Sequence, residues 1–193
     1  MNSPQANSAI PTFSPEQLKA SLWADTNVQV YALILGRSVG DLPERLAQAD
    51  AGRELGSYDC LWPGALGPIR RQQAPFLVLL KRDSAFTDWL LREAGAGFGE
   101  WGVLMRSSRS FLAMRSHCRH CSQARLPDGT EIEIDWMDPL LLRALLPLAP
   151  RDQVEDLFAP LDALIIVGTH NWTICTQQFG RLQMQEQRLM AAA

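Results

Sequence analysis

The sequence predicts a single domain of the α/β (α+β) class, in which helices flank a mixed β-sheet. Short apolar runs of strand length alternate with helical segments through the first half of the chain. A hairpin pattern follows in the second half. The length of 193 residues is enough to bury a sizeable core. We divide the chain into a mobile N-terminal segment (1–13), an α/β domain (14–176) and a C-terminal helix (177–193).

The first part of the domain is predicted to run helix, strand, helix, loop. Ser14 can cap a helix over 14–22, because its side chain can accept from a free backbone N–H of the first turn. The run 28–35 is apolar and β-branched, which predicts a strand buried on both faces. A helix is predicted over 42–51. Residues 60–71 are dense in Gly and Pro and predict a loop.

The middle of the chain repeats this alternation. An apolar run predicts a second buried strand over 76–80, and Ser84 can cap a helix that extends to about residue 93. The Gly-rich segment 94–100 predicts a linker, and the next apolar run predicts a third strand over 101–105. A helix capped by Ser110 follows.

A hairpin and an abrupt helix make the best-defined segment of the sequence. Asp128 and Gly129 lie between two short runs, and an Asp-Gly pair favours a tight turn because Gly tolerates a positive φ. Asp138 can accept hydrogen bonds from the first turn of the next helix, and Pro139 suits its first position. These four residues are predicted to be structural. The leucines of 140–146 predict a helix that is almost wholly buried.

The remaining elements are predicted from shorter patterns. Residues 150–158 favour a helix, and the runs 163–167 and 172–176 favour two paired strands. The final segment is polar and is predicted to be a helix that carries Leu182 and Met184 on its apolar side.

Composition limits the function classes. The net charge of −3 gives no electrostatic basis for nucleic-acid binding. No apolar run approaches the roughly 20 residues of a membrane span, and the N-terminus lacks the pattern of a secretory signal. We therefore expect a cytoplasmic protein with its four cysteines reduced.

Two adjacent His-Cys pairs form the most conspicuous chemical cluster: His117, Cys118, His120 and Cys121. Cys and His are the ligands that zinc prefers. Four ligands within five residues cannot all reach one tetrahedral ion from a helix, and no second pair follows at the usual spacing. We interpret the cluster as the end of an amphipathic helix with the cysteines inward and the histidines outward. A zinc enzyme remains the alternative.

Other catalytic patterns are absent from the sequence. No nucleophile elbow occurs, and the Gly-x-Gly-x-Gly run over 95–99 precedes a strand where a dinucleotide-binding loop would follow one. We therefore predict no catalytic, cofactor-binding or metal-binding residues. The carboxylates of Glu131, Glu133 and Asp135 share one strand face, which indicates a solvated surface or a contact with a basic partner.

Candidate partner-binding residues come from three places. Trp62 lies in the Gly-Pro loop near Arg70 and Arg71, and Trp and Arg are enriched at interface hot spots. The other candidates lie before the Leu-rich helix and in the C-terminal segment: Asp135, Trp136, Leu182 and Met184.

The order of landmarks resembles a known family. VYALIL (30–35), APFLVLL (74–80), WGVLMRSSRSFLAMRSHCR (101–119) and the segment from LPDG to VEDLF (126–158) are similar to the adaptor or chaperone domain of bacterial type VI secretion systems, described as domain-of-unknown-function family 4123. The family usually carries an Arg shortly before the Asp-Pro pair and an aromatic residue directly before it. Asp135 and Met137 occupy those places here.

The resemblance implies a non-enzyme that binds a toxic effector in the cytoplasm. Such proteins help to load the effector onto the secretion spike, a VgrG trimer or its PAAR-type tip. The resemblance also implies that a larger helical lobe is replaced here by the short C-terminal helix. An immunity-type inhibitor is a further alternative.

Overall fold

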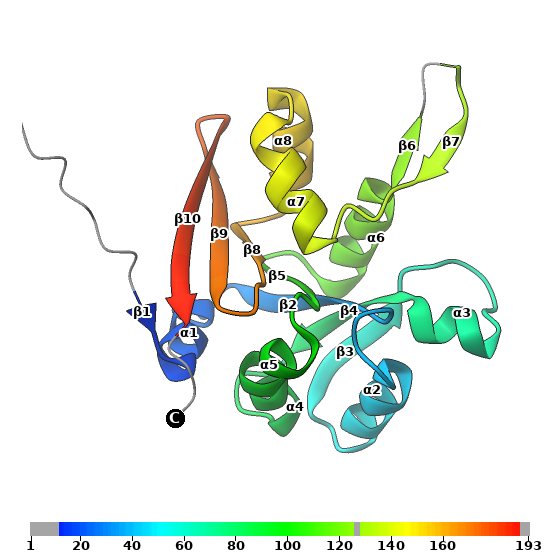
Figure 1. Ribbon diagram of the computed structural model, residues 1–193, viewed down its shortest axis with the longest axis vertical. Coiled ribbons are helices and arrows are strands. Elements are labelled where there is room, and N and C mark those ends of the chain that lie inside the picture. The colour runs from blue at the N-terminus through cyan, green and yellow to red at the C-terminus, as the bar shows by residue number, and fades with distance from the viewer. Residues whose placement is uncertain (1–11, 126–127, 190–193) are drawn as a thin grey trace, which may run out of the picture.

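The computed structural model of the protein describes residues 12–125 and 128–189, which form a mixed α/β domain (Figure 1). The fold class predicted from the sequence is therefore confirmed. Its eight-stranded sheet is antiparallel except at one edge, where β1 pairs in parallel with β10. The strands across the sheet are, in order, β1 (Thr12–Phe13), β10 (Arg181–Leu189), β9 (Asn171–Gln178), β8 (Ala163–Ile166), β5 (Gly102–Ser107), β2 (Gln29–Leu35), β4 (Pro75–Leu80) and β3 (Leu55–Cys60).

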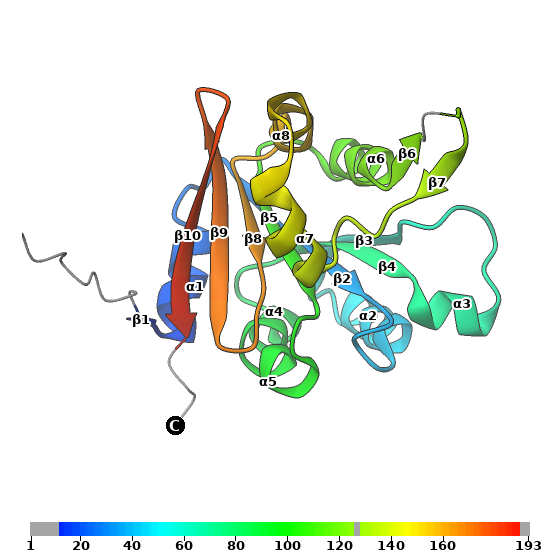
Figure 2. The same ribbon diagram turned by 45° about the horizontal axis from the view of Figure 1, so that its top comes forward.

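Helices cover both faces of this sheet, and a small hairpin of β6 (Gln123–Arg125) and β7 (Glu131–Glu133) projects beside it (Figures 1 and 2). The helices, in chain order, are α1 (Pro15–Leu22), α2 (Leu42–Ala51), α3 (Pro68–Gln73), α4 (Ala85–Trp89), the π-helical turn η1 (Leu90–Ala94), α5 (Gly95–Phe98), α6 (Phe111–Cys121), α7 (Pro139–Leu145), the 3-10 turn η2 (Leu146–Leu148) and α8 (Arg151–Phe158).

The central strand β2 is buried on both faces, as its apolar run predicts. All six residues from Val30 to Leu35 are buried, and alternate side chains enter two separate cores. Val30, Ala32 and Ile34 belong to the core beneath α1, α2 and α4. The other set, which includes Leu33, belongs to the core beneath α6, α7 and α8. The two cores make the domain a three-layer structure with the sheet in the middle.

Local capping explains where several helices begin. Ser14 accepts a hydrogen bond from the N–H of Gln17 while the Gln17 side chain accepts from the N–H of Ser14, which is a complete capping box. Ser84 and Ser110 each accept from an N–H in the first turn of the helix that follows. Because these pairings satisfy otherwise free donors, the predicted starts of α1, α4 and α6 are confirmed.

The C-terminal segment is a strand, so the helix predicted over 177–193 is wrong for the described residues. Strand β10 pairs with β9 from Arg181 to Arg188, after a two-residue turn at Phe179 and Gly180. Both turn residues have positive φ, 52° and 72°, which suits a tight antiparallel hairpin. Leu182 and Met184 therefore follow a strand period of two. Residues 190–193 lie outside the described part of the chain.

Three further segments differ from the predictions. Strand β3 was not predicted, and α3 begins inside the segment 60–71 that we expected to be a loop. The Gly-rich segment 94–100 is helical up to Phe98. Tertiary packing decides these cases, since local Gly and Pro content alone indicates a loop. The predicted mobility of the N-terminus falls mostly on residues 1–11, which lie outside the described part.

Candidate binding groove

Helix α7 is fixed at its N-terminus by the residues that the sequence marks as structural. Asp138 accepts hydrogen bonds from the N–H groups of Leu140 (2.9 Å) and Leu141 (3.2 Å), and Pro139 occupies the first helical position. Arg37, just after β2, forms ion pairs with Asp138 (2.8 Å) and with Asp135. The helix start is thus tied to the central strand of the sheet.

The leucines of this segment divide between the core and the surface. Leu142 and Leu146 face the sheet and are 6% and 5% exposed. Leu141, Leu145 and Leu148 are 42%, 56% and 79% exposed. The prediction of an almost wholly buried helix is therefore wrong. A helix that packs on a sheet buries one stripe only, so the remaining leucines have nothing in the described structure to cover them.

The exposed leucines form one wall of an apolar groove with a volume of about 560 Å³. Ile134 and Trp136, at the base of the β6–β7 hairpin, also line it, together with residues of α8. The Trp136 indole N–H donates to the carbonyl oxygen of Cys118 at 3.3 Å, which anchors the hairpin base to α6. The groove therefore lies where α6, the hairpin, α7, η2 and α8 meet.

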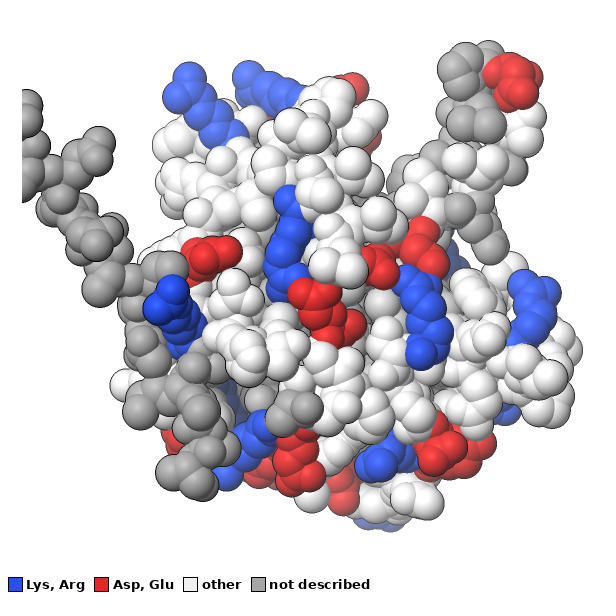
Figure 3. Space-filling view, in the orientation of Figure 1, with Lys and Arg blue, Asp and Glu red and all other residues white. Residues whose placement is uncertain are grey.

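Few charged side chains line this groove. Asp156 carries the only carboxylate among its described lining residues, and no Lys or Arg is among them. His120, exposed at the end of α6, is the one ionisable base there. Figure 3 shows Lys, Arg, Asp and Glu side chains across the middle of this face, around the lower end of α7, and mainly uncharged ones above them. Large exposed apolar patches of this kind mark interaction sites in folded proteins.

The His-Cys cluster lies at the side of the groove. The His117 Nε2 donates to the carbonyl oxygen of Leu157 at 3.0 Å, and the Cys121 Sγ lies 3.5 Å from the same nitrogen. Burial lowers the pKa of His117 and raises the pKa of Cys121 to about 11. The pair is therefore neutral near pH 7, which is the opposite of the thiolate and imidazolium that an activated Cys needs.

The cluster also does not assemble a metal site. Cys118 is fully buried and faces the core, whereas His120 is exposed. Within 12–125 and 128–189, no group of three or more His, Cys, Asp or Glu side chains is placed to hold a metal ion. Cys118 and His120 lie as expected for the end of an amphipathic helix. His117, expected outward, is half-buried, and Cys121, expected inward, is partly exposed and lines the groove.

A smaller depression lies on the other side of the hairpin base. It has a volume of about 100 Å³, and Trp62 and Asp135 are among its lining residues. Gln123 and Ile134 line both this depression and the groove. The structure thus brings Trp62, Asp135 and Trp136 near one hairpin.

Other contacts of these candidates are internal. Trp62 packs partly against the core, and the Arg70 guanidinium carbon lies 5.4 Å from its ring centroid. The Asp135 carboxylate is already paired with Arg37. Arg71 is exposed near the end of α3.

Leu182 and Met184 lie elsewhere on the sheet. They share one face of β10, opposite Gln177 and Cys175 of β9. Leu182 packs against the α7-side core, and Met184 is 37% exposed. Neither lines the groove.

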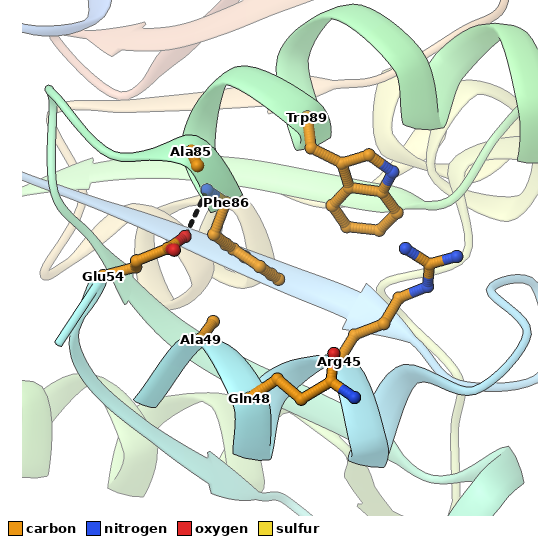
Figure 4. A pocket seen from close by; sticks show the side chains of 7 residues that line it. All are labelled: Arg45, Gln48, Ala49, Glu54, Ala85, Phe86 and Trp89. Carbon is orange, nitrogen blue, oxygen red and sulfur yellow. Dashed lines mark hydrogen bonds between the residues drawn. The ribbon is translucent and has the colours of Figure 1, made fainter. Parts of the chain in front are cut away.

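A further pocket lies on the opposite face of the sheet, and its two charged side chains, Arg45 and Glu54, already contact neighbouring residues (Figure 4). Glu54 accepts a hydrogen bond from the N–H of Phe86 at 2.7 Å, at the start of α4. The guanidinium carbon of Arg45 lies 4.8 Å from the ring centroid of Trp89. These contacts join α2 to α4, and they give the pocket a structural role.

Sequence reasoning missed the main lining residues of the groove. The sequence predicts that Leu141 and Leu145 are buried, and it singles out none of Leu148, Ile134 and Asp156. One signal was available. Five leucines within seven consecutive positions exceed what a single buried helix stripe can hold.

The fold and the groove define a mixed α/β domain that keeps an apolar helix face open. The chain belongs to the family described as Domain of unknown function (DUF4123), whose model matches residues 30–156. The matched region runs from β2 into α8 and includes all of the lining residues of the groove given for the described chain except Leu157. No curated protein and no solved structure matches the chain. In the described part, none of the helices has the length and apolar character needed to cross a membrane.

Proposed function

We propose that this protein is a non-enzymatic adaptor of type VI secretion, which binds a toxic effector in the cytoplasm and promotes its loading onto the VgrG or PAAR spike. The observation that carries the proposal is the open groove with its three exposed leucines. Membership of the DUF4123 family supports it, because the resemblance carried by the order of sequence landmarks implies an adaptor of this kind. The neutral His-Cys pair favours binding over catalysis.

The mechanism follows from the groove. An apolar effector segment that enters it removes both its own surface and that of Leu141, Leu145 and Leu148 from water, at roughly 25 cal/mol per Å² of apolar area. Release then requires a competing interaction as the spike assembles. An adaptor of this design protects an effector without changing it chemically.

Co-purification tests this function. The tagged protein is expressed with the effector or spike protein encoded beside it, and the complex is isolated from cells. We expect the pair Leu145→Asp and Leu148→Asp to abolish recovery of the effector, because it places two carboxylates in the apolar wall. Leu112→Asp is the matched control, since Leu112 is 69% exposed and lies outside the groove.

Two outcomes would contradict the proposal. In the first, neither protein co-purifies and deletion leaves effector secretion unchanged. In the second, the protein silences the toxin without affecting its delivery, which identifies an immunity-type inhibitor instead.

A further inference from the structure

Two helices present uncovered rows of side chains to the same groove. On α7 and η2 the row is Leu141, Leu145 and Leu148, at positions i, i+4 and i+7. On α8 the row is Gln153, Asp156 and Leu157, at positions i, i+3 and i+4. Residues at these spacings lie on one side of a helix. The α7 row extends over about two helical turns, or roughly 10 Å.

The walls of the groove decide which backbone conformation can enter it. They are made mainly of apolar side chains. A buried backbone N–H or C=O without a hydrogen-bond partner is costly. An extended segment would bring such groups against these leucines, whereas a helix satisfies its backbone hydrogen bonds internally. A third helix laid against the two rows is therefore the ligand that this groove fits.

The charge of the groove restricts the ligand further. Asp156 lies among the lining residues, and Asp152 is exposed one helical turn earlier on α8. Glu155, the third acidic residue of this helix, is paired with Arg151 at 2.7 Å. No ion pair joins Asp156 or Asp152 to another described residue. A positive side chain on the ligand gains from this arrangement, and a negative one is repelled.

We propose that the groove receives an amphipathic helix of a partner protein, with apolar residues spaced i, i+3 or i+4, and i+7, and with a Lys or Arg that faces Asp156. This inference rests on the proposed function. It concerns the same groove and specifies the chemical class of the ligand. In the adaptor role, the helix belongs to the effector.

A peptide selection tests the inference with the full chain as bait. Two display libraries of about 16 residues are used, a length at which isolated helices become marginally stable. One library has a helix-favouring frame, and the other has the same composition with a central Pro that prevents a continuous helix. We expect enrichment from the helical library only, with the apolar spacing and the basic residue described above.

Variants then locate the binding site of the best peptide. Leu145→Asp together with Leu148→Asp is expected to weaken its Kd by about tenfold or more, as loss of hot-spot residues does. Leu112→Asp is expected to change it less than about twofold, as a surface position outside the groove does. All three leucines are more than half exposed, so these variants are expected to fold.

A charge exchange tests the role of Asp156. Replacing the basic residue of the peptide by Glu is expected to weaken binding to the native protein about two- to fivefold, and Asp156→Lys is expected to restore it. Asp152→Lys is the matched control on the same helix, and it should restore less, because Asp152 does not line the groove.

Several results would overturn the inference. These are enrichment from the Pro library, no enrichment at all, insensitivity to the two Leu→Asp changes, or failure of the charge exchange. A concentration-dependent dimer in sedimentation that Leu145→Asp and Leu148→Asp abolish would show that a second copy occupies the groove. If helical peptides bind but no effector co-purifies, the adaptor role fails while the ligand class stands. If the effector binds and the peptides do not, the adaptor role stands while the proposed ligand class fails.

Discussion

Two neighbouring leucines of α7 give a direct test of which face of this helix is open. Leu142 is 6% exposed and packs in the α7-side core, so Leu142→Ala removes buried methyl groups and leaves a cavity. Such changes cost about 2–5 kcal/mol, and we expect about 3 kcal/mol here. Leu145 is 56% exposed. Full burial of a Leu side chain contributes roughly 1.5–3 kcal/mol to the free energy of unfolding, and Leu145 has less than half of its surface buried. Leu145→Ala should therefore cost about 1 kcal/mol or less.

Urea unfolding followed by tryptophan fluorescence measures the difference. At an m-value of about 2 kcal/mol/M, a gap of about 2 kcal/mol separates the two midpoints by about 1 M. Both substitutions are Leu to Ala in α7, and these two residue types lie close together in helix propensity, so propensity contributes little to either value.

Equal destabilisation by the two changes would refute the reasoning. It would mean that Leu145 is covered in solution by the protein itself, and the groove would then not be open for a partner. The proposed function and the inference about its ligand would both lose their main support.

Three further predictions concern the surroundings of the groove. Asp138→Ala should cost about 1 kcal/mol in urea unfolding, whereas Asp138→Asn should cost less because Asn still caps α7; equal losses would contradict the capping role. Burial lowers the pKa of His117 below 6.5, so the unfolded chain binds the proton more readily. The free energy of unfolding should therefore fall as the pH drops through about 6.5, and His117→Gln should flatten that dependence. An unchanged pH profile in the variant would contradict the assignment to His117. Burial raises the pKa of Cys121 to about 11, so at about pH 8 its thiol should react with a disulfide reagent far more slowly in the native protein than in urea, and equal rates would show that it is accessible.

The sequence predicts the framework of this fold well. The apolar runs that form β2, β4 and β5 and the caps of α1, α4, α6 and α7 depend on neighbouring residues, so local patterns are sufficient. The C-terminal strand was missed for a physical reason. Leu182 and Met184 are too few apolar residues to distinguish the alternation of a strand from the spacing of a short helix. Only the pairing with β9 makes the segment a strand.

The groove was harder to predict than the fold. Which leucines of α7 face outward depends on how the helix is rotated against the sheet. Arg37, which is distant in the chain, helps to set that rotation through its ion pair with Asp138. The sequence marks Trp62 as a candidate partner-binding residue, but the Arg70 guanidinium over its ring and the adjacent core leave it only partly accessible. Side-chain neighbours of this kind do not follow from local spacing.

The parallel contact between β1 and β10 has a consequence for biosynthesis. Thr12 and Phe13 pair with Arg188 and Leu189, so one edge of the sheet joins segments from opposite ends of the described chain. A ribosome releases the earlier residues long before the later ones. This edge therefore closes only after the rest of the sheet has been translated, and until then β1 lacks the strand with which it pairs and offers an unpaired strand edge to other nascent chains.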